Sequence, residues 1–126
     1  MSEVNEKFNT IMPETTDRVL CVQIDRLISE EGYKENFLPR LEKMIEKYGE
    51  IRLLVNYLNF EGWENDAARE DMFSSVAFGR KVKKMAFVNT PESEIFRRTM
   101  IEENISGETK LFSEEQLQDA IDWVKS

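Results

Sequence analysis

The feature that most constrains the fold is a near-continuous apolar stretch at residues 51–58 of this 126-residue chain. Its sequence, IRLLVNYL, is rich in branched and aromatic side chains that favour strands. A strand with one face in water alternates apolar and polar side chains, whereas this stretch is apolar at most positions. The pattern is typical of a central parallel strand that is covered on both faces. We therefore expect a parallel sheet with helices packed against it.

Strand-like and helix-like segments alternate along the rest of the chain. Further strands are predicted at residues 7–12, 19–24, 85–88 and 109–112. Helices are predicted at about 29–48, 65–79, 90–106 and 113–124, and a loop at 59–63. This order predicts an α/β fold for residues 1–126 as a single domain. We expect a mostly parallel mixed sheet of about five strands, flanked by about four helices.

Local residues predict where helices end or bend. Pro39 lies inside the first helical pattern and should kink that helix or split it into a short lead-in and a main segment. Gly49 directly follows the pattern and is a good C-terminal stop. Ser113 and Gln116 form the S-x-x-Q pattern of a capping box at the start of the last helix.

The chain contains no histidine, which excludes several kinds of chemistry. Histidine is the commonest general base near neutral pH and the commonest ligand of transition metals. Cys21 is the single cysteine and lies in an apolar run, so we expect a buried structural thiol. Acidic residues around the start of the second helix, Asp71 among them, are explained by the favourable field of a helix N-terminus. We expect no enzyme, no catalytic residue, no metal and no cofactor.

Charge and hydropathy limit the partners and the location. With 17 basic and 25 acidic residues, the net charge of −8 repels phosphates, so we expect no nucleic acid partner. No apolar run approaches the roughly 20 residues that a membrane span needs. Residues 1–10 are polar and of mixed charge, unlike a signal peptide. The expected location is the cytoplasm.

Several short motifs together resemble the SpoIIAA-like proteins, a family related to STAS domains. The most specific motifs are EKYGEIRLLV at 46–55 and FEGW at 60–63. Leu38 followed by Pro39, KMAFV at 84–88 and AIDWV at 120–124 also fit, in order and at the right spacing. The resemblance runs from about residue 13 to 124. It implies a compact sheet flanked by helices and no established catalytic activity.

The resemblance implies two functional classes. STAS domains act as protein-interaction modules, and some are switched by phosphorylation. SpoIIAA-like proteins are similar in shape to lipid-binding domains of the CRAL-TRIO type, which implies an apolar small molecule, a lipid or a membrane surface. Anti-sigma factor antagonists carry a serine that becomes phosphorylated, and it has no counterpart here, since residues 58–65 contain no Ser, Thr or Tyr. Ser74 and Ser75 lie too late to replace it. The alternative to ligand binding is therefore a protein partner or homodimer without that switch.

Candidate ligand contacts follow the central strand, where open α/β sheets bind ligands. Phe60 and Trp63 either form the wall or entry lip of a pocket or simply pack their loop onto the second helix, which is the usual role of such aromatics. Soft apolar side chains on the second and third helices either line a groove between them or form ordinary core. The groove residues would be Met72, Phe73, Val76, Phe96 and Met100.

A basic cluster stands out in this acidic chain. It consists of Arg80, Lys81, Lys83 and Lys84. One interpretation is peripheral contact with anionic headgroups or an acidic partner, because cations near an anionic surface each gain about 1 kcal/mol. The other is favourable charge at a helix C-terminus followed by a solvated connection.

Overall fold

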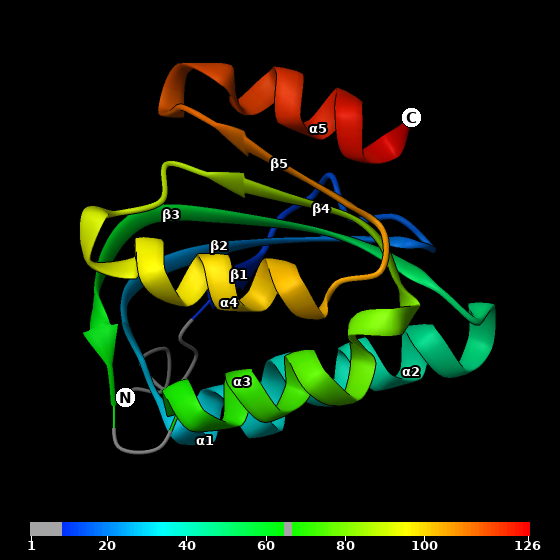
Figure 1. The fold of residues 1–126 in the computed structure, drawn as a ribbon, viewed down its shortest axis with the longest axis horizontal. Coiled ribbons are helices and arrows are strands. Elements are labelled where there is room, and N and C mark those ends of the chain that lie inside the picture. Colours follow the sequence, from blue (N-terminus) through cyan, green and yellow to red (C-terminus); the bar gives the residue numbers. More distant parts are fainter. Residues whose placement is uncertain (1–8, 65–66) are drawn as a thin grey trace.

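In a computed structural model, which describes residues 9–64 and 67–126, five strands form one sheet in chain order (Figure 1). The strands are β1 (Asn9–Ile11), β2 (Val19–Ile28), β3 (Ile51–Trp63), β4 (Val82–Val88) and β5 (Glu108–Phe112). β1 runs antiparallel to β2, and the other neighbouring pairs are parallel. The predicted mostly parallel mixed sheet is confirmed.

Helices cover both faces of the sheet, as predicted (Figure 1). The helices on one face are α1 (Glu30–Gly32), α2 (Leu38–Tyr48), α3 (Ala67–Phe78) and α4 (Ile95–Asn104), whereas α5 (Leu117–Lys125) covers the other. A π turn, η2 (Tyr33–Phe37), joins α1 to α2, and the 3-10 turns are η3 (Gly79–Lys81), η4 (Glu92–Glu94) and η5 (Glu114–Gln116). α3 and α4 each begin at the edge of the sheet where the parallel strands end.

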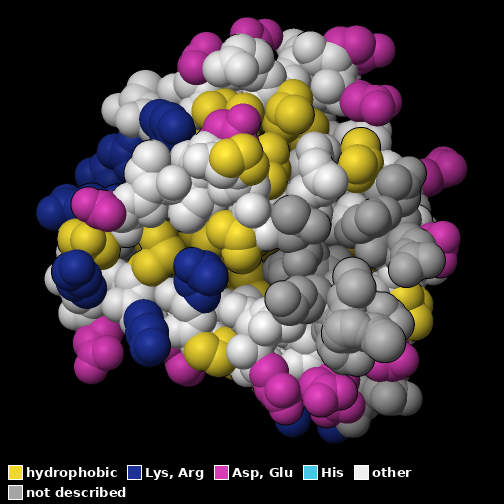
Figure 2. Space-filling model, turned by 180° about the vertical axis from the view of Figure 1, so that it is seen from behind, with side chains coloured by type: hydrophobic (Ala, Val, Ile, Leu, Met, Phe, Trp, Pro, Cys, Tyr) yellow, Lys and Arg dark blue, Asp and Glu magenta, His cyan; other side chains and the backbone are white. Residues whose placement is uncertain are grey.

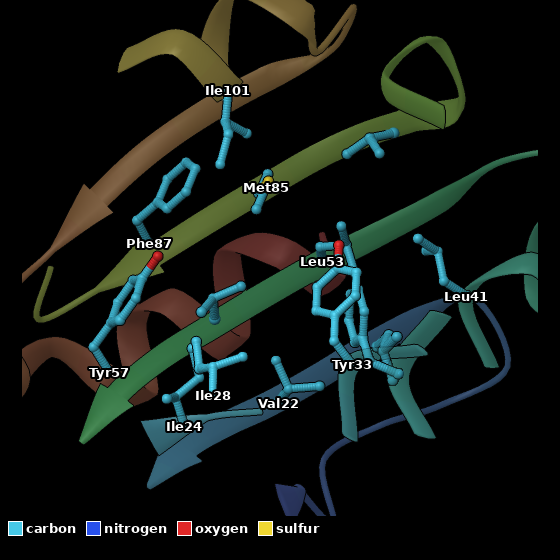
Figure 3. Close-up of a cluster of buried hydrophobic side chains, with 14 of the residues drawn as sticks. Val22, Ile24, Ile28, Tyr33, Leu41, Leu53, Tyr57, Met85, Phe87 and Ile101 are labelled. Carbon is cyan, nitrogen blue, oxygen red and sulfur yellow. The ribbon is translucent and has the colours of Figure 1, made fainter. Parts of the chain in front are cut away.

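Each face of the sheet has its own apolar core. Side chains such as Leu53 and Phe87 pack beneath the helices of the first face (Figure 3). Leu54 and Cys21 pack beneath α5 on the second face. The successive residues Leu53 and Leu54 of β3 are both buried because adjacent side chains on a strand point to opposite faces. The two-sided coverage predicted for the central strand is confirmed.

The loop predicted at 59–63 is wrong, because β3 continues through those residues to Trp63. β2 also runs further than predicted, to Ile28, and it supplies the hydrogen-bonding partner for the longer strand. The pairing of β2 with β3 shifts register after Ile24 and after Arg26, where β3 has an extra residue, and Gly62 has a φ of 136°. The paired strands can therefore bend there (Figure 1). The segment contains polar residues and a glycine, so its sequence does not indicate a strand. The strand is stabilised there by pairing with β2 rather than by its own composition.

The disturbance predicted around Pro39 is confirmed as a π turn between α1 and α2. The backbone N–H of Leu38 bonds to the carbonyl of Tyr33, five residues earlier. Proline has no N–H and its ring crowds the preceding turn, so regular α-helical bonding is interrupted there. Gly49 ends α2 in the left-handed region with φ of 83°, and its N–H lies 2.7 Å from the Ile45 carbonyl.

Candidate functional site

The first core contains a partly open cavity of about 70 Å³ beneath α3 and α4. Its apolar walls come from β2, β3, β4 and α4 and include Val22, Leu53, Val55, Met85, Phe87 and Ile101. Figure 3 shows side chains of the strands facing Tyr33 and Ile101 from the helices. An engineered cavity of roughly 150 Å³ binds benzene, so this one has room for a smaller apolar group or a few waters.

A cluster of polar side chains adjoins this cavity at the carboxyl edge of the sheet. We call it the polar cluster, and its members are Tyr33, Trp63, Asp71, Glu94 and Arg97. Arg97 is its centre: Nε donates to Oε1 of Glu94 at 3.0 Å, and Nη2 donates to Oδ2 of Asp71 at 2.9 Å. The Tyr33 hydroxyl donates to the other Asp71 oxygen at 2.7 Å. Tyr33, Trp63, Asp71 and Arg97 all line the cavity.

Trp63 joins the cluster in two ways. Its indole Nε1 donates to Oε1 of Glu94 at 3.0 Å, and the guanidinium carbon of Arg97 lies 4.0 Å from the indole centroid. Stacking of this kind is a geometry that the planar guanidinium favours. The end of β3 is thereby connected to the start of α4.

The fold explains why these residues meet. α3 follows β3 and α4 follows β4, so the first turns of both helices lie at the edge where those strands end. Asp71 lies near the start of α3, and Arg97 lies in the first turn of α4. The carboxyl edge of an open α/β sheet is where such folds bind ligands.

The ion pairs of the polar cluster are largely buried. Glu94 is only 5% exposed, and Arg97 and Asp71 are half-buried. Burial disfavours the charge of Arg97, but Asp71 and Glu94 more than offset this, so the pKa of Arg97 is raised above its ordinary value. Burial and the neighbouring Asp71 charge likewise raise the pKa of Tyr33, which stays a protonated donor. Buried charges of this kind are stable only when paired.

One nitrogen of the Arg97 guanidinium has no hydrogen-bond partner within the described part of the chain. Nη1 of Arg97 is buried and meets no acceptor there. Other buried polar atoms without a partner in that part belong to Glu14, Thr90 and Arg98, none of which lines the cavity.

The residues predicted to bind a ligand are only partly brought together. Trp63 lines the cavity. Phe60 packs against the first core, with its ring centroid 5.6 Å from Tyr57 and 6.1 Å from Trp63 in edge-to-face contacts. Met72 also packs against that core.

The remaining predicted contacts lie on the outside of α3 and α4. Phe73 is 62% exposed, Val76 66%, Phe96 75% and Met100 39%. None of them lines the cavity within the described residues, so a ligand there would not touch them. Their role in binding stays a prediction.

The sequence interpretation missed Tyr33, Asp71, Glu94 and Arg97. Glu94 and Arg97 stand three residues apart at a helix start, which is a local pattern that could have identified an ion pair. Asp71 lies 26 residues from Arg97 and 38 from Tyr33, so only the folded chain reveals those contacts.

The basic cluster does not form one surface. Lys84 bonds to the Trp123 carbonyl at 3.2 Å and to the Ser126 hydroxyl at 2.8 Å, at the end of α5. Lys83 points to the other face of the sheet and lies 3.9 Å from Glu50. Arg80 and Lys81 are exposed in η3. Contact of these residues with a membrane or an anionic partner stays a prediction.

Charge is nevertheless uneven over the molecule. On the side opposite to Figure 1, Lys and Arg side chains gather towards the end of the molecule where α2 ends, and acidic side chains occupy most of the remaining outline (Figure 2). No helix within residues 9–64 and 67–126 is both long and apolar enough to cross a membrane.

Cys21 is a buried thiol, as predicted, and is fully covered beneath α5. Burial raises the pKa of the Cys21 thiol to about 11. In the part of the chain that the structure describes, no group of three or more Cys, Asp or Glu residues is placed to hold a metal ion.

Comparisons with known proteins agree with the resemblance found in the sequence. A family model described as SpoIIAA-like matches residues 19–125. The crystal structure of an uncharacterized DUF3478 family protein with a SpoIIAA-like fold, from Shewanella loihica PV-4, matches with a TM-score of 0.67. The match covers 92% of this chain and 91% of that chain at 24% identity, so it shows the fold alone. A search of curated proteins found no match.

Proposed function

This chain belongs to the SpoIIAA-like family, and from that premise we propose that it is a non-catalytic module that binds a small, mainly apolar ligand in the cavity beneath α3 and α4. The observation that carries the proposal is the cavity itself, with apolar walls and a polar cluster beside it. Protein interiors are otherwise packed as densely as organic crystals, with few voids. Sites for small molecules commonly combine apolar walls with a few placed polar groups.

The cavity volume limits the ligand. Pockets for drug-sized ligands measure roughly 300–1,000 Å³, whereas this one measures about 70 Å³. A short or cyclic hydrocarbon group fits with little movement, while a long acyl chain needs α3 and α4 to separate. A lipid-like ligand therefore requires an open form, and a compact ligand does not.

The polar cluster supports binding rather than catalysis. Both carboxylates are bound to Arg97, so neither is placed as a free general base. The hydroxyl of Ser75, which also lines the cavity, donates to the Met72 carbonyl at 2.8 Å and accepts from Asn104. No base activates it as a nucleophile among the described residues.

The proposal is tested by native mass spectrometry of freshly purified protein, followed by NMR titration with small hydrocarbons. We expect shifts in the Ile101 methyl and Trp63 indole resonances, and weaker shifts in a Val55→Leu variant, whose added methylene occupies the cavity. Val88→Leu makes the same change in the second core and serves as the matched control. Saturable shifts at residues of the α5 face alone would refute the proposal.

The alternative is a protein-interaction module of the STAS kind. The observation that favours it is the exposure of large apolar side chains on α3 and α4 described above, since such side chains mark interaction sites when they are contiguous. A double variant, Phe73→Ser with Phe96→Ser, would then lower self-association or partner binding in sedimentation experiments. Unchanged sedimentation of the wild-type protein as a monomer at all concentrations would count against a homodimer.

Peripheral membrane contact is a separate part of the proposal and rests on Arg80, Lys81 and Lys83. We expect co-sedimentation with phosphatidylserine vesicles that falls with added salt. Arg80→Glu combined with Lys81→Glu should abolish it, while Lys84→Gln, at the α5 end, should not. Binding that is indifferent to the double variant would exclude this surface.

A further inference from the structure

We propose that Nη1 of Arg97 recognises the polar end of the ligand, and that this end is an uncharged oxygen acceptor, such as a ketone, ester or amide carbonyl. The inference rests on the proposed function, because it assumes that the cavity takes a ligand. It specifies which atom of the protein hydrogen-bonds to the ligand and which kind of head group the site selects.

The geometry leaves Nη1 as the guanidinium nitrogen without a hydrogen-bond partner among the described residues. A guanidinium carries its donors in a rigid plane. Nε donates to Glu94 and Nη2 donates to Asp71, and the Trp63 ring packs against one face of the guanidinium. Nη1 is buried and meets no acceptor among the described residues, although native proteins pair nearly all such groups. Because Arg97 lines the cavity, an acceptor oxygen on a bound ligand can meet this need.

The charge of the cluster determines what kind of oxygen is accepted. Arg97 brings one positive charge, and Asp71 and Glu94 bring two negative charges within hydrogen-bonding distance of it. A carboxylate or phosphate bound to Nη1 would add a third anion to this half-buried site and would be repelled by both carboxylates. A carbonyl oxygen accepts the same hydrogen bond without adding charge.

Further hydrogen bonds fix the two carboxylates that bind Arg97. Asp71 is fixed from its other oxygen by the Tyr33 hydroxyl, and Glu94 is fixed by the Trp63 indole. These bonds set the guanidinium in one orientation before any ligand arrives. A donor fixed in advance costs little ordering on binding, so a single hydrogen bond can discriminate between ligands of the same shape.

The test uses three probes built on the same five-membered carbon ring: cyclopentanone, methylenecyclopentane and the larger cyclopentanecarboxylate. Methylenecyclopentane has the shape of the ketone but no acceptor. We expect the ketone to bind the wild-type protein roughly 10- to 100-fold more tightly than methylenecyclopentane, the usual effect of one hydrogen bond to a charged donor. We expect the carboxylate to bind more weakly than either, by NMR titration at pH 7.

Two variants separate recognition from folding. Arg97→Lys keeps a cation for Asp71 and Glu94 but removes Nη1, so the preference for the ketone should fall to within about twofold. Arg98→Lys makes the same change at a neighbour that does not line the cavity, and it should keep the preference. The wild-type ratio of the two affinities does not depend on either variant folding.

The outcomes distinguish this inference from the function on which it rests. If the ketone and methylenecyclopentane bind the wild type equally, the cavity binds ligands but Arg97 does not recognise their oxygen. The inference is then overturned, while the proposed function stands. If the carboxylate binds best, the head group is an anion and the inference is again overturned. If none of the probes binds, the proposed function fails together with it.

Discussion

The side chains of Trp63 and Arg97 share one acceptor: both donate to Oε1 of Glu94, each at 3.0 Å. Trp63 ends β3, and Arg97 lies in the first turn of α4, so the last residue of a central strand is linked to a helix that follows the next strand. The polar cluster is therefore a structural link as well as a candidate recognition site.

Glu94→Gln should destabilise the protein by about 1.5–3 kcal/mol, because the charge that pairs with Arg97 is lost while the side-chain shape is kept. Glu94 is buried and serves two donors. Glu92→Gln, an exposed change in the same turn, should stay within about 0.5 kcal/mol of wild type. Urea unfolding measures both, and equal stabilities would show that the pair contributes nothing.

Val55→Leu should cost less than about 1 kcal/mol, or stabilise the protein, because the larger side chain enters the cavity that Val55 lines. Val88→Leu puts the same extra methylene into the second core, where Val88 is fully buried, and should cost about 1–3 kcal/mol. Thermal unfolding of the two variants compares them directly. A larger loss for Val55→Leu than for Val88→Leu would mean that the cavity does not accept the added volume.

Gly79→Ala should destabilise the protein by more than about 3 kcal/mol. A Cβ at this position would lie 2.0 Å from the backbone oxygen of Asn104, at the end of α4, and backbone cannot move aside as a flexible side chain can. Gly49→Ala meets no atom within 4 Å and carries only the strain of a left-handed φ of 83°, about 1–2 kcal/mol. Chemical denaturation should therefore rank the two variants well apart, and similar losses would contradict the close approach of η3 to α4.

Stability should fall between about pH 9 and 11. The folded protein raises the pKa of the Cys21 thiol from 9.0 to about 11, so folding favours the neutral thiol. This contribution is fully present below the pKa of the unfolded thiol and is lost as the pH rises through the folded value. A shift of this size corresponds to at most about 3 kcal/mol.

Cys21→Ala removes that contribution, so urea midpoints of the variant should depend less on pH across this interval than those of the wild type. Tyr33 and Tyr57 also have raised pKa values from burial, and they leave a residual slope above pH 10 in both proteins. Parallel curves for variant and wild type would show that Cys21 ionisation does not limit stability.

The parts of the fold that were predictable are those that a local pattern determines. The central strand was found because Leu53, Leu54 and Val55 are consecutive and apolar, which only burial on both faces explains. The interrupted helix was found because proline acts on its own turn. The extension of β3 to Trp63 was missed because it depends on pairing with β2, a strand that is distant in the sequence.

The candidate site was predictable only at Trp63, which ends the central strand. Asp71 and Arg97 were hidden because charged residues at helix starts have an adequate local explanation, and their contact arises only when α3 and α4 pack side by side on the sheet. Phe73 and Phe96 fit a helical apolar pattern, but a pattern does not say which of several apolar faces turns inward, and both residues lie on the outer one.

The order of the strands in the sheet, β1-β2-β3-β4-β5, is also the order in which a ribosome delivers them. Each new strand can pair with one already in place, and none has to be inserted between earlier strands. α5 is delivered last, yet it supplies Ala120, Ile121 and Val124 to the core that covers Cys21. A nascent chain halted before α5 therefore presents this thiol to labelling reagents, and completion of synthesis closes it.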